Sequence, residues 1–146
     1  MSKFKKSFHI RGRDFIRAGE ASINVQNLLK SMDFDSRLIR RVAICGYESE
    51  MNVVMHGGDG SLSLEVDTDK LILEISDDGP GIEDIDLAMQ TGYSTANDDH
   101  REMGFGAGMG LPNMKKNSDQ IRIESNKDQG TVVRMIFFLP GGEIRQ

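Results

Sequence analysis

The chain has 146 residues, of which 38% are hydrophobic and 28% charged, a composition typical of one globular, water-soluble domain. Its 18 basic and 23 acidic residues give a net charge of −5, which argues against a nucleic-acid binder that neutralises phosphates. A single cysteine excludes an intrachain disulfide and a cysteine-rich zinc site, and no apolar run approaches the roughly 18 residues of a membrane span. We therefore expect a single cytoplasmic domain over residues 1–146, with no direct nucleic-acid or membrane partner.

The first third of the chain predicts a strand and two helices. Residues 3–12 alternate in the manner of a strand, and Asp14 is placed to cap a first helix. The apolar stripe of this helix follows steps of three and four residues: Phe15, Ala18, Ser22, Val25, Leu29 and Met32. Asp35 or Ser36 caps a second helix that runs to His56, where the glycines of "HGGDG" end it.

The remainder predicts four strands and one short helix. Residues 61–66 and 71–76 form a pair of strands around "DTDK", and residues 120–125 and 130–140 form another around "NKDQG". Between the two pairs, Pro112 can open a short helix. Because the strands come in hairpins and the helices are segregated, we expect an α+β two-layer sandwich. Its sheet should be mixed, mostly antiparallel, and covered by helices on one face.

Three polar residues of the second helix share a face. Glu48, Asn52 and His56 are spaced by four, so each step turns by about 40°. One interpretation is a half-exposed Glu48 with His56 as a cation at the helix C-terminus, and an isolated E-x-x-x-N favours it. The other is a site in which Asn52 binds a hard cation and Glu48 acts as a base or orients water. Cys45 on the same helix is expected to be a buried packing residue.

Two glycine-rich segments follow. Asp77 ends an apolar strand, and Gly79 and Gly81 in "DDGPGI" allow close approach to a flat ligand, although such dipeptides also form ordinary turns. In "EMGFGAGMGLPN" glycine recurs at every second position, which suits a loop whose N–H groups bind phosphates ahead of a helix. The spacing matches neither a Walker P-loop nor a dinucleotide fingerprint.

Together these segments resemble the Bergerat-type ATP-binding fold shared by gyrase, heat-shock chaperones, mismatch-repair ATPases and histidine kinases. The Glu48–Asn52 helix, the Asp77 strand end, the glycine lid and the late Gly130–Thr131 pair occur in the family's order. We expect no phosphoacceptor-histidine helix pair before the domain and no transducer domain after it. A free-standing unit of this kind resembles the anti-sigma-factor and switch serine-kinase branch. The similarity covers about residues 8–139 and is especially close to switch kinases in "DDGPGIEDIDLAMQTGYST" and "GAGMGLPNMKKNSD".

The resemblance implies ATP and Mg²⁺ as cofactors. Asn52 would hold the metal against the phosphates, and Glu48 would be the catalytic residue that orients or deprotonates the attacking hydroxyl. Asp77 would accept a hydrogen bond from the adenine amino group. The implied nucleotide-binding residues are Asn52, Asp77, Gly79, Gly81, Ile82, Gly104, Gly106, Gly108, Met109, Gly110, Leu111 and Thr131.

The implied activity is that of an ATP-dependent protein serine/threonine kinase, an anti-sigma or switch regulator that phosphorylates a small anti-anti-sigma-type protein on serine. The alternative is a non-catalytic, nucleotide-sensing module that sequesters a sigma factor or activates a partner phosphatase. A basic residue is expected near the γ-phosphate, with Arg101, Lys115 and Lys116 as candidates, and the acidic residues of 95–102 should face solvent. A homodimer would pair through the first helix and strand, where the apolar residues are Phe4, Phe8 and Ile10.

Overall fold

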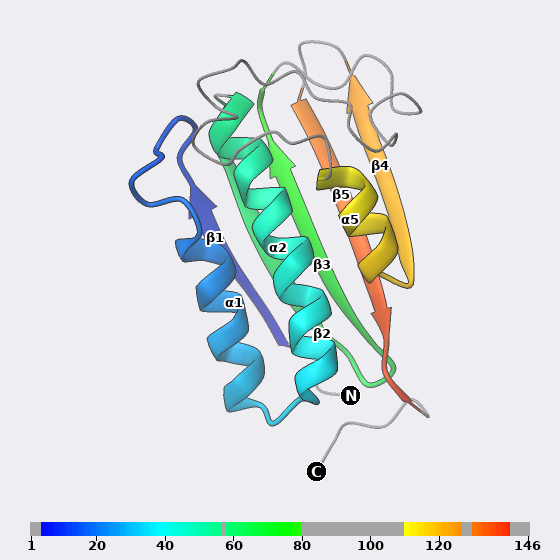
Figure 1. Ribbon diagram of the computed structural model, residues 1–146. Helices are drawn as coiled ribbons and strands as arrows, with labels where there is room; N and C mark the ends of the chain where they lie inside the picture. The colour runs from blue at the N-terminus through cyan, green and yellow to red at the C-terminus, as the bar shows by residue number, and fades with distance from the viewer. Residues whose placement is uncertain (1–3, 57, 80–109, 127–129, 141–146) are drawn as a thin grey trace.

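The computed structural model describes residues 4–56, 58–79, 110–126 and 130–140 (Figure 1). The elements in these ranges are β1 (Phe4–Ile10), α1 (Glu20–Ser31), α2 (Ser36–His56), β2 (Gly60–Val66), β3 (Lys70–Asp77), α5 (Gly110–Asn117), β4 (Gln120–Asn126) and β5 (Gly130–Phe138). Each predicted strand and helix is present. Most bounds lie within two residues of those expected from the sequence, and the start of α1 is the main exception.

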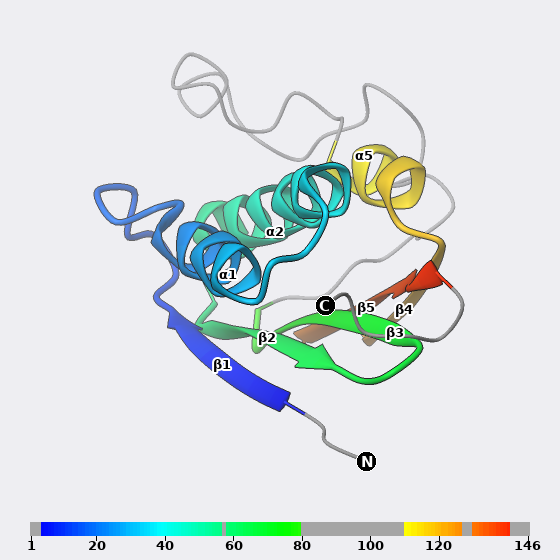
Figure 2. The same cartoon turned by 90° about the horizontal axis from the view of Figure 1, so that it is seen from below.

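The strands form one sheet in the order β1-β2-β3-β5-β4. All the pairings between these described strands are antiparallel, so the sheet is antiparallel where we expected a mixed one. Helices α1, α2 and α5 lie side by side on one face of the sheet (Figures 1 and 2). The expected α+β two-layer sandwich is therefore confirmed.

The core lies between the sheet and the helices. Alternate strand residues point toward the helices, and the register pairs Leu64 with Leu73 and Leu73 with Met135, all three fully buried. Glu74 and Arg134 lie on the other face of the sheet, where they form an ion pair at 3.3 Å. This alternation fixes which strand residues face the helices, and Asp77 and Thr131 share the helix-facing side.

The start of α1 differs from the prediction. The helix begins at Glu20 rather than after Asp14, and Gly19 occupies the N-cap with a left-handed φ of 101°. Asp14 instead accepts a hydrogen bond from the backbone N–H of Arg17 in a preceding turn. The N–H groups at the start of α1 find their acceptor on α2, where the carboxylate of Glu50 binds them. A tertiary contact therefore replaces the local cap that the sequence suggested.

Helix α2 begins where expected. It starts at Ser36, and the Asp35 carboxylate accepts a hydrogen bond from the Arg37 N–H at 3.4 Å. The helix lies between α1 and α5 over the middle of the sheet (Figure 1). Among the described helices, none is both long and apolar enough to cross a membrane.

The apolar side chains of β1 pack against the protein's own core. Phe4 and Phe8 pack against the core, and Ile10 is buried in it. Pairing between two copies through this strand stays a prediction.

Candidate functional site

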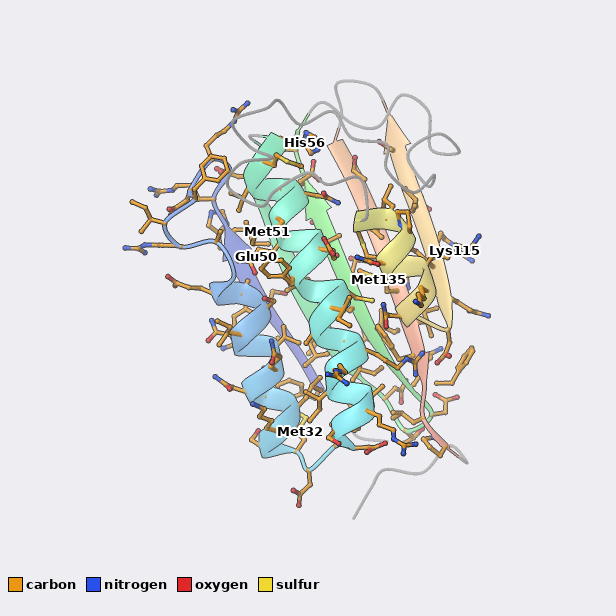
Figure 3. All side chains as sticks on the ribbon, in the orientation of Figure 1. Met32, Glu50, Met51, His56, Lys115 and Met135 are labelled. Carbon is orange, nitrogen blue, oxygen red and sulfur yellow. The ribbon has the colours of Figure 1, made fainter. Side chains whose placement is uncertain are left out.

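Helix α2 presents different carboxylates to its two neighbouring helices. Glu48 and Glu50 are two residues apart, so they point about 200° away from each other around the helix axis. Glu50 faces α1, as its label in Figure 3 shows, and it is 3% exposed. Glu48 faces α5 and is half-buried. The side of α2 that carries the predicted site is thus the side toward α5.

The carboxylate of Glu48 is held by a residue that the sequence analysis did not single out. Oε2 of Glu48 accepts a hydrogen bond from Nδ2 of Asn113 on α5, at 2.8 Å. Asn113 lies three residues after Gly110, so both are on the face of α5 that approaches α2. That spacing within "GLPN" is the signal that could have identified it.

Asn52 lies one helical turn beyond Glu48 and is half-buried. A Cβ atom added to Gly110 would lie 3.4 Å from both the nitrogen and the oxygen of the Asn52 amide. The Asn52 side chain makes no hydrogen bond to any other residue in the described part of the chain. Its amide oxygen is a hard ligand of the kind that Mg²⁺ prefers, so this residue fits the magnesium role implied for it.

Asp77 is the last residue of β3 and lies opposite Thr131 on β5. Burial raises the pKa of the Asp77 carboxyl above its usual range, while the Gly79 N–H, the charge of His56 and the backbone of Thr131 act in the opposite direction. The Gly79 N–H donates to Oδ1 at 2.9 Å. Asp77 is thus a partly desolvated acceptor with one oxygen engaged in its own turn.

His56 and Thr131 complete the surroundings of Asp77. His56 ends α2 (Figure 3) and lies close enough for its charge to lower the pKa of Asp77. His56 is exposed at the helix terminus, and its role there, as a terminal cation or in the pocket, stays a prediction. Thr131 is 8% exposed, and its hydroxyl shares a hydrogen bond with the Ser125 hydroxyl at 3.0 Å.

Two glycines here are explained by contacts within the protein. Gly130 has a φ of 91°, and a Cβ atom there would overlap the carbonyl oxygen of Asp77. A Cβ atom at Gly79 would lie 3.1 Å from Oδ1 of Asp77. A glycine at position 79 therefore leaves room for the carboxylate of Asp77, and the close approach of a ligand to Gly79 stays a prediction.

The turn after β3 is clamped to the start of β2. The backbone N–H of Asp59 donates to Oδ1 of Asp78 at 2.7 Å, and the N–H of Asp78 donates to the carbonyl of Asp59 at 3.0 Å. The Asp59 carboxylate in turn accepts the N–H of Gly12 at 3.1 Å. These contacts fix the backbone next to Asp77, and the sequence pattern gave no sign of them.

The other predicted site residues divide into two groups. Gly81, Ile82, Arg101, Gly104, Gly106, Gly108, Met109 and the acidic residues of 95–102 lie outside the described residues. Leu111 is 7% exposed and packs in the hydrophobic core. Lys115 and Lys116 are exposed, and Figure 3 shows Lys115 on the side of α5 away from α2.

Cys45 confirms its expected packing role. Burial raises the pKa of its thiol to about 12, and the group donates to the carbonyl oxygen of Met114 at 3.6 Å. A neutral, buried thiol has little nucleophilic character.

A cavity of about 380 Å³ lies away from these residues, near the start of α1. Its polar lining comes from His9, Arg11, Asp14, Arg17, Glu20 and Glu50. It contains none of the predicted site residues, so we base the site on the α2–α5 contact and the end of β3.

Residues 43–141 match the family described as histidine kinase-, DNA gyrase B-, and HSP90-like ATPases. This segment is more than half of the chain and includes Glu48, Asn52, Asp77 and Thr131. The chain therefore belongs to this family, as its resemblance indicated, and ATP is the cofactor that family membership supports.

Individual proteins of known name are also similar to this chain. The chain is 31% identical over 104 residues to an anti-sigma F factor of Thermoanaerobacter sp. (strain X514), covering 71% of this chain and 65% of that protein. It is 29% identical over 118 residues to the serine/threonine-protein kinase RsbT of Bacillus subtilis, covering 78% and 83% respectively. The mycobacterial sensor histidine kinase MprB shares the fold, with a TM-score of 0.55 at 14% identity over 92% of this chain and 97% of that one. The chain thus spans about 65% of the length of the first anti-sigma relatives it matches.

Proposed function

We propose that this chain is an ATP- and Mg²⁺-dependent protein serine kinase. In this proposal, residues 1–146 act as one domain in the cytoplasm, and the kinase is an anti-sigma or switch regulator. Its substrate is a small anti-anti-sigma-type protein, phosphorylated on serine. Family membership and the similarity to proteins named anti-sigma F factor and RsbT support this assignment. The observation that carries it is the pair of Glu48 and Asn52 on the side of α2 that faces α5.

Each described residue has a role that suits its surroundings. The Asn52 amide oxygen would hold Mg²⁺, and the ion would neutralise charge on the phosphates. Asp77 uses Oδ1 for the N–H of Gly79 and has Oδ2 for the adenine amino group. Thr131 lies beside it across the strand pair. Gly110, the first residue of α5, lies next to Asn52. We propose that the residues before it form the phosphate-binding loop, with Gly104, Gly106, Gly108 and Met109.

Glu48 acts on the attacking hydroxyl. The serine oxygen forms a bond to the γ-phosphorus, the bond from that phosphorus to the bridging oxygen breaks, and ADP leaves with the electron pair. The hydroxyl proton passes to the Glu48 carboxylate, which is half-buried and makes one described hydrogen bond, to a neutral amide. Phosphoryl transfer depends mostly on positioning and charge neutralisation, which this arrangement supplies.

The test is transfer of label from [γ-³²P]ATP, with Mg²⁺ present, to a purified protein of the anti-anti-sigma class encoded beside this chain. We expect label on serine. Glu48→Gln should abolish transfer while calorimetry shows ATP binding unchanged. Transfer undiminished in Glu48→Gln would contradict the role of Glu48.

A second candidate is a nucleotide-sensing module without catalysis. The closeness of Gly110 to Asn52 favours it: a Cβ atom at Gly110 would touch the Asn52 amide, so a change at Asn52 would affect the start of α5. The partner would be a sigma factor or a phosphatase, retained differently with ADP and with ATP. Pull-down of such a partner with each nucleotide, together with no label on any protein, would favour this candidate over the kinase.

A further inference from the structure

A hydrogen bond joins α5 to Glu48, the predicted general base. Nδ2 of Asn113 donates to Oε2 of Glu48 at 2.8 Å, a distance at the strong end for an amide donor. We propose that Asn113 is a positioning residue that holds the Glu48 carboxylate in the orientation from which it serves the attacking hydroxyl. This inference rests on the proposed kinase function and adds a residue to its site.

The chemistry of the donor suits that role. A lysine or arginine in the same place would pair with the carboxylate and make it a weaker proton acceptor. The Asn113 amide is neutral, so it fixes the direction of the carboxylate without neutralising it. It engages Oε2, and no hydrogen bond from another described residue engages Oε1. Within the described part of the chain, one oxygen is therefore anchored and the other is the one that we propose meets the substrate.

The backbone that carries Asn113 is itself held in place. The next residue, Met114, is fully buried and contacts α2 twice: its sulfur accepts the Ser49 hydroxyl at 3.2 Å and its carbonyl accepts the Cys45 thiol. The carbonyl of Asn113 accepts the side-chain amide of Asn117 at 2.8 Å. Because Ser49 and Cys45 flank Glu48 along α2, these contacts fix how α5 lies against α2 beside Glu48.

Packing does not account for Asn113. The residues of α5 that fill the core are Leu111 and Met114, whereas Asn113 is half-buried and polar. A leucine in its place keeps the branched shape of the side chain, although it is somewhat larger, and removes the amide. Stability and turnover are thus expected to respond differently to substitution.

The experiment compares Asn113→Leu and Asn113→Asp with the wild type, using the full chain and the substrate protein. Asn27→Leu is the matched control, because it makes the same change at an exposed position of α1, away from Glu48. We expect Asn113→Leu to lower kcat about tenfold, the value of one oriented hydrogen bond, with KM for ATP unchanged. Asn27→Leu should leave kcat near that of the wild type.

Asn113→Asp separates orientation from shape. Its side chain has the same size, but at neutral pH a second carboxylate would repel Glu48, so kcat should fall below that of Asn113→Leu. As the pH falls and the introduced carboxyl takes up a proton, it becomes a donor and activity should recover. A purely structural role would not produce this pH dependence.

Glu48→Gln, measured alongside, distinguishes failure of the proposed kinase role of Glu48 from failure of the positioning role of Asn113. Full activity in Glu48→Gln overturns both the kinase assignment of Glu48 and this inference. Loss in Glu48→Gln with wild-type kcat in Asn113→Leu overturns the inference alone. A readout without turnover is the side-chain amide of Asn113 in ¹⁵N-correlated spectra: Glu48→Ala should move its signals strongly. Unchanged signals would show that the contact is absent in solution.

Discussion

The two glutamates on opposite sides of α2 differ in how fully their oxygens are satisfied. Glu50 is 3% exposed and accepts the N–H groups of Gly19, Ala21 and Ser22 at 2.9–3.2 Å. Glu48 is half-buried and accepts one neutral amide. A carboxylate saturated by backbone donors is part of the framework, because moving it would leave those donors unpaired. A carboxylate with one anchored oxygen remains available for chemistry.

The largest expected effect would test the structural side of this comparison. Glu50→Ala leaves three buried N–H groups at the start of α1 without an acceptor, so the free energy of unfolding should fall by about 3 kcal/mol or more. Urea denaturation measures this loss, and Glu48→Ala is the matched control, with an expected loss of about 1 kcal/mol or less. Equal losses in the two variants would break the distinction.

Substitutions of two glycines, Gly19 near Glu50 and Gly130 near Asp77, extend the comparison between framework and site. Gly130 and Gly19 both have positive φ, at 91° and 101°, but a Cβ atom at Gly130 would overlap the Asp77 carbonyl while at Gly19 it meets nothing within 4 Å. Gly19→Ala should therefore cost about 1 kcal/mol of strain alone, and Gly130→Ala about 2–3 kcal/mol. Only Gly130→Ala should also weaken ATP binding, because it displaces the backbone of Asp77. Denaturation and calorimetry on the same preparations check both expectations.

Asp77→Asn has a smaller, two-sided effect. ATP affinity should fall about tenfold, since the adenine amino group loses a charged acceptor. Burial raises the folded-state pKa of Asp77, so the stability tied to its neutral form is present at low pH and lost as the pH rises through that pKa. The variant cannot ionise, and at pH 7 it should melt at the same temperature as the wild type or higher. Any such advantage should vanish below about pH 4, and a higher wild-type melting temperature at pH 7 would contradict it.

Much of the fold could be predicted because local patterns determine it. The apolar run of residues 71–75 and the capping Asp35 before α2 are short-range features, and the structure places both elements as expected. The start of α1 could not be predicted in the same way. Its cap comes from Glu50, 28–31 residues away along the chain, and a pattern of apolar spacings does not reveal such a donor–acceptor match.

The site shows the same division. The E-x-x-x-N spacing identified the face of α2 that approaches α5, and the end of β3 brought Asp77 beside Thr131. The spacing selected Glu48, but it gave no sign that Glu50 is the more deeply buried of the two, because burial depends on the neighbouring helix. It also missed Asn113 and the Asp59–Asp78 clamp, since both are pairings between segments distant in sequence. The place of Gly130 in the pocket stays a prediction, and the structure adds that a side chain there would overlap the carbonyl of Asp77.

Our central proposal is that ATP binds on the side of α2 that faces α5, through Mg²⁺ held by Asn52. The most direct measurement is calorimetric titration of ATP into the wild type and Asn52→Ala, each with Mg²⁺ and with EDTA. We predict that Mg²⁺ strengthens binding to the wild type and has little effect on the variant. No detectable binding to the wild type at millimolar ATP, or an equal magnesium effect in both proteins, would contradict the account.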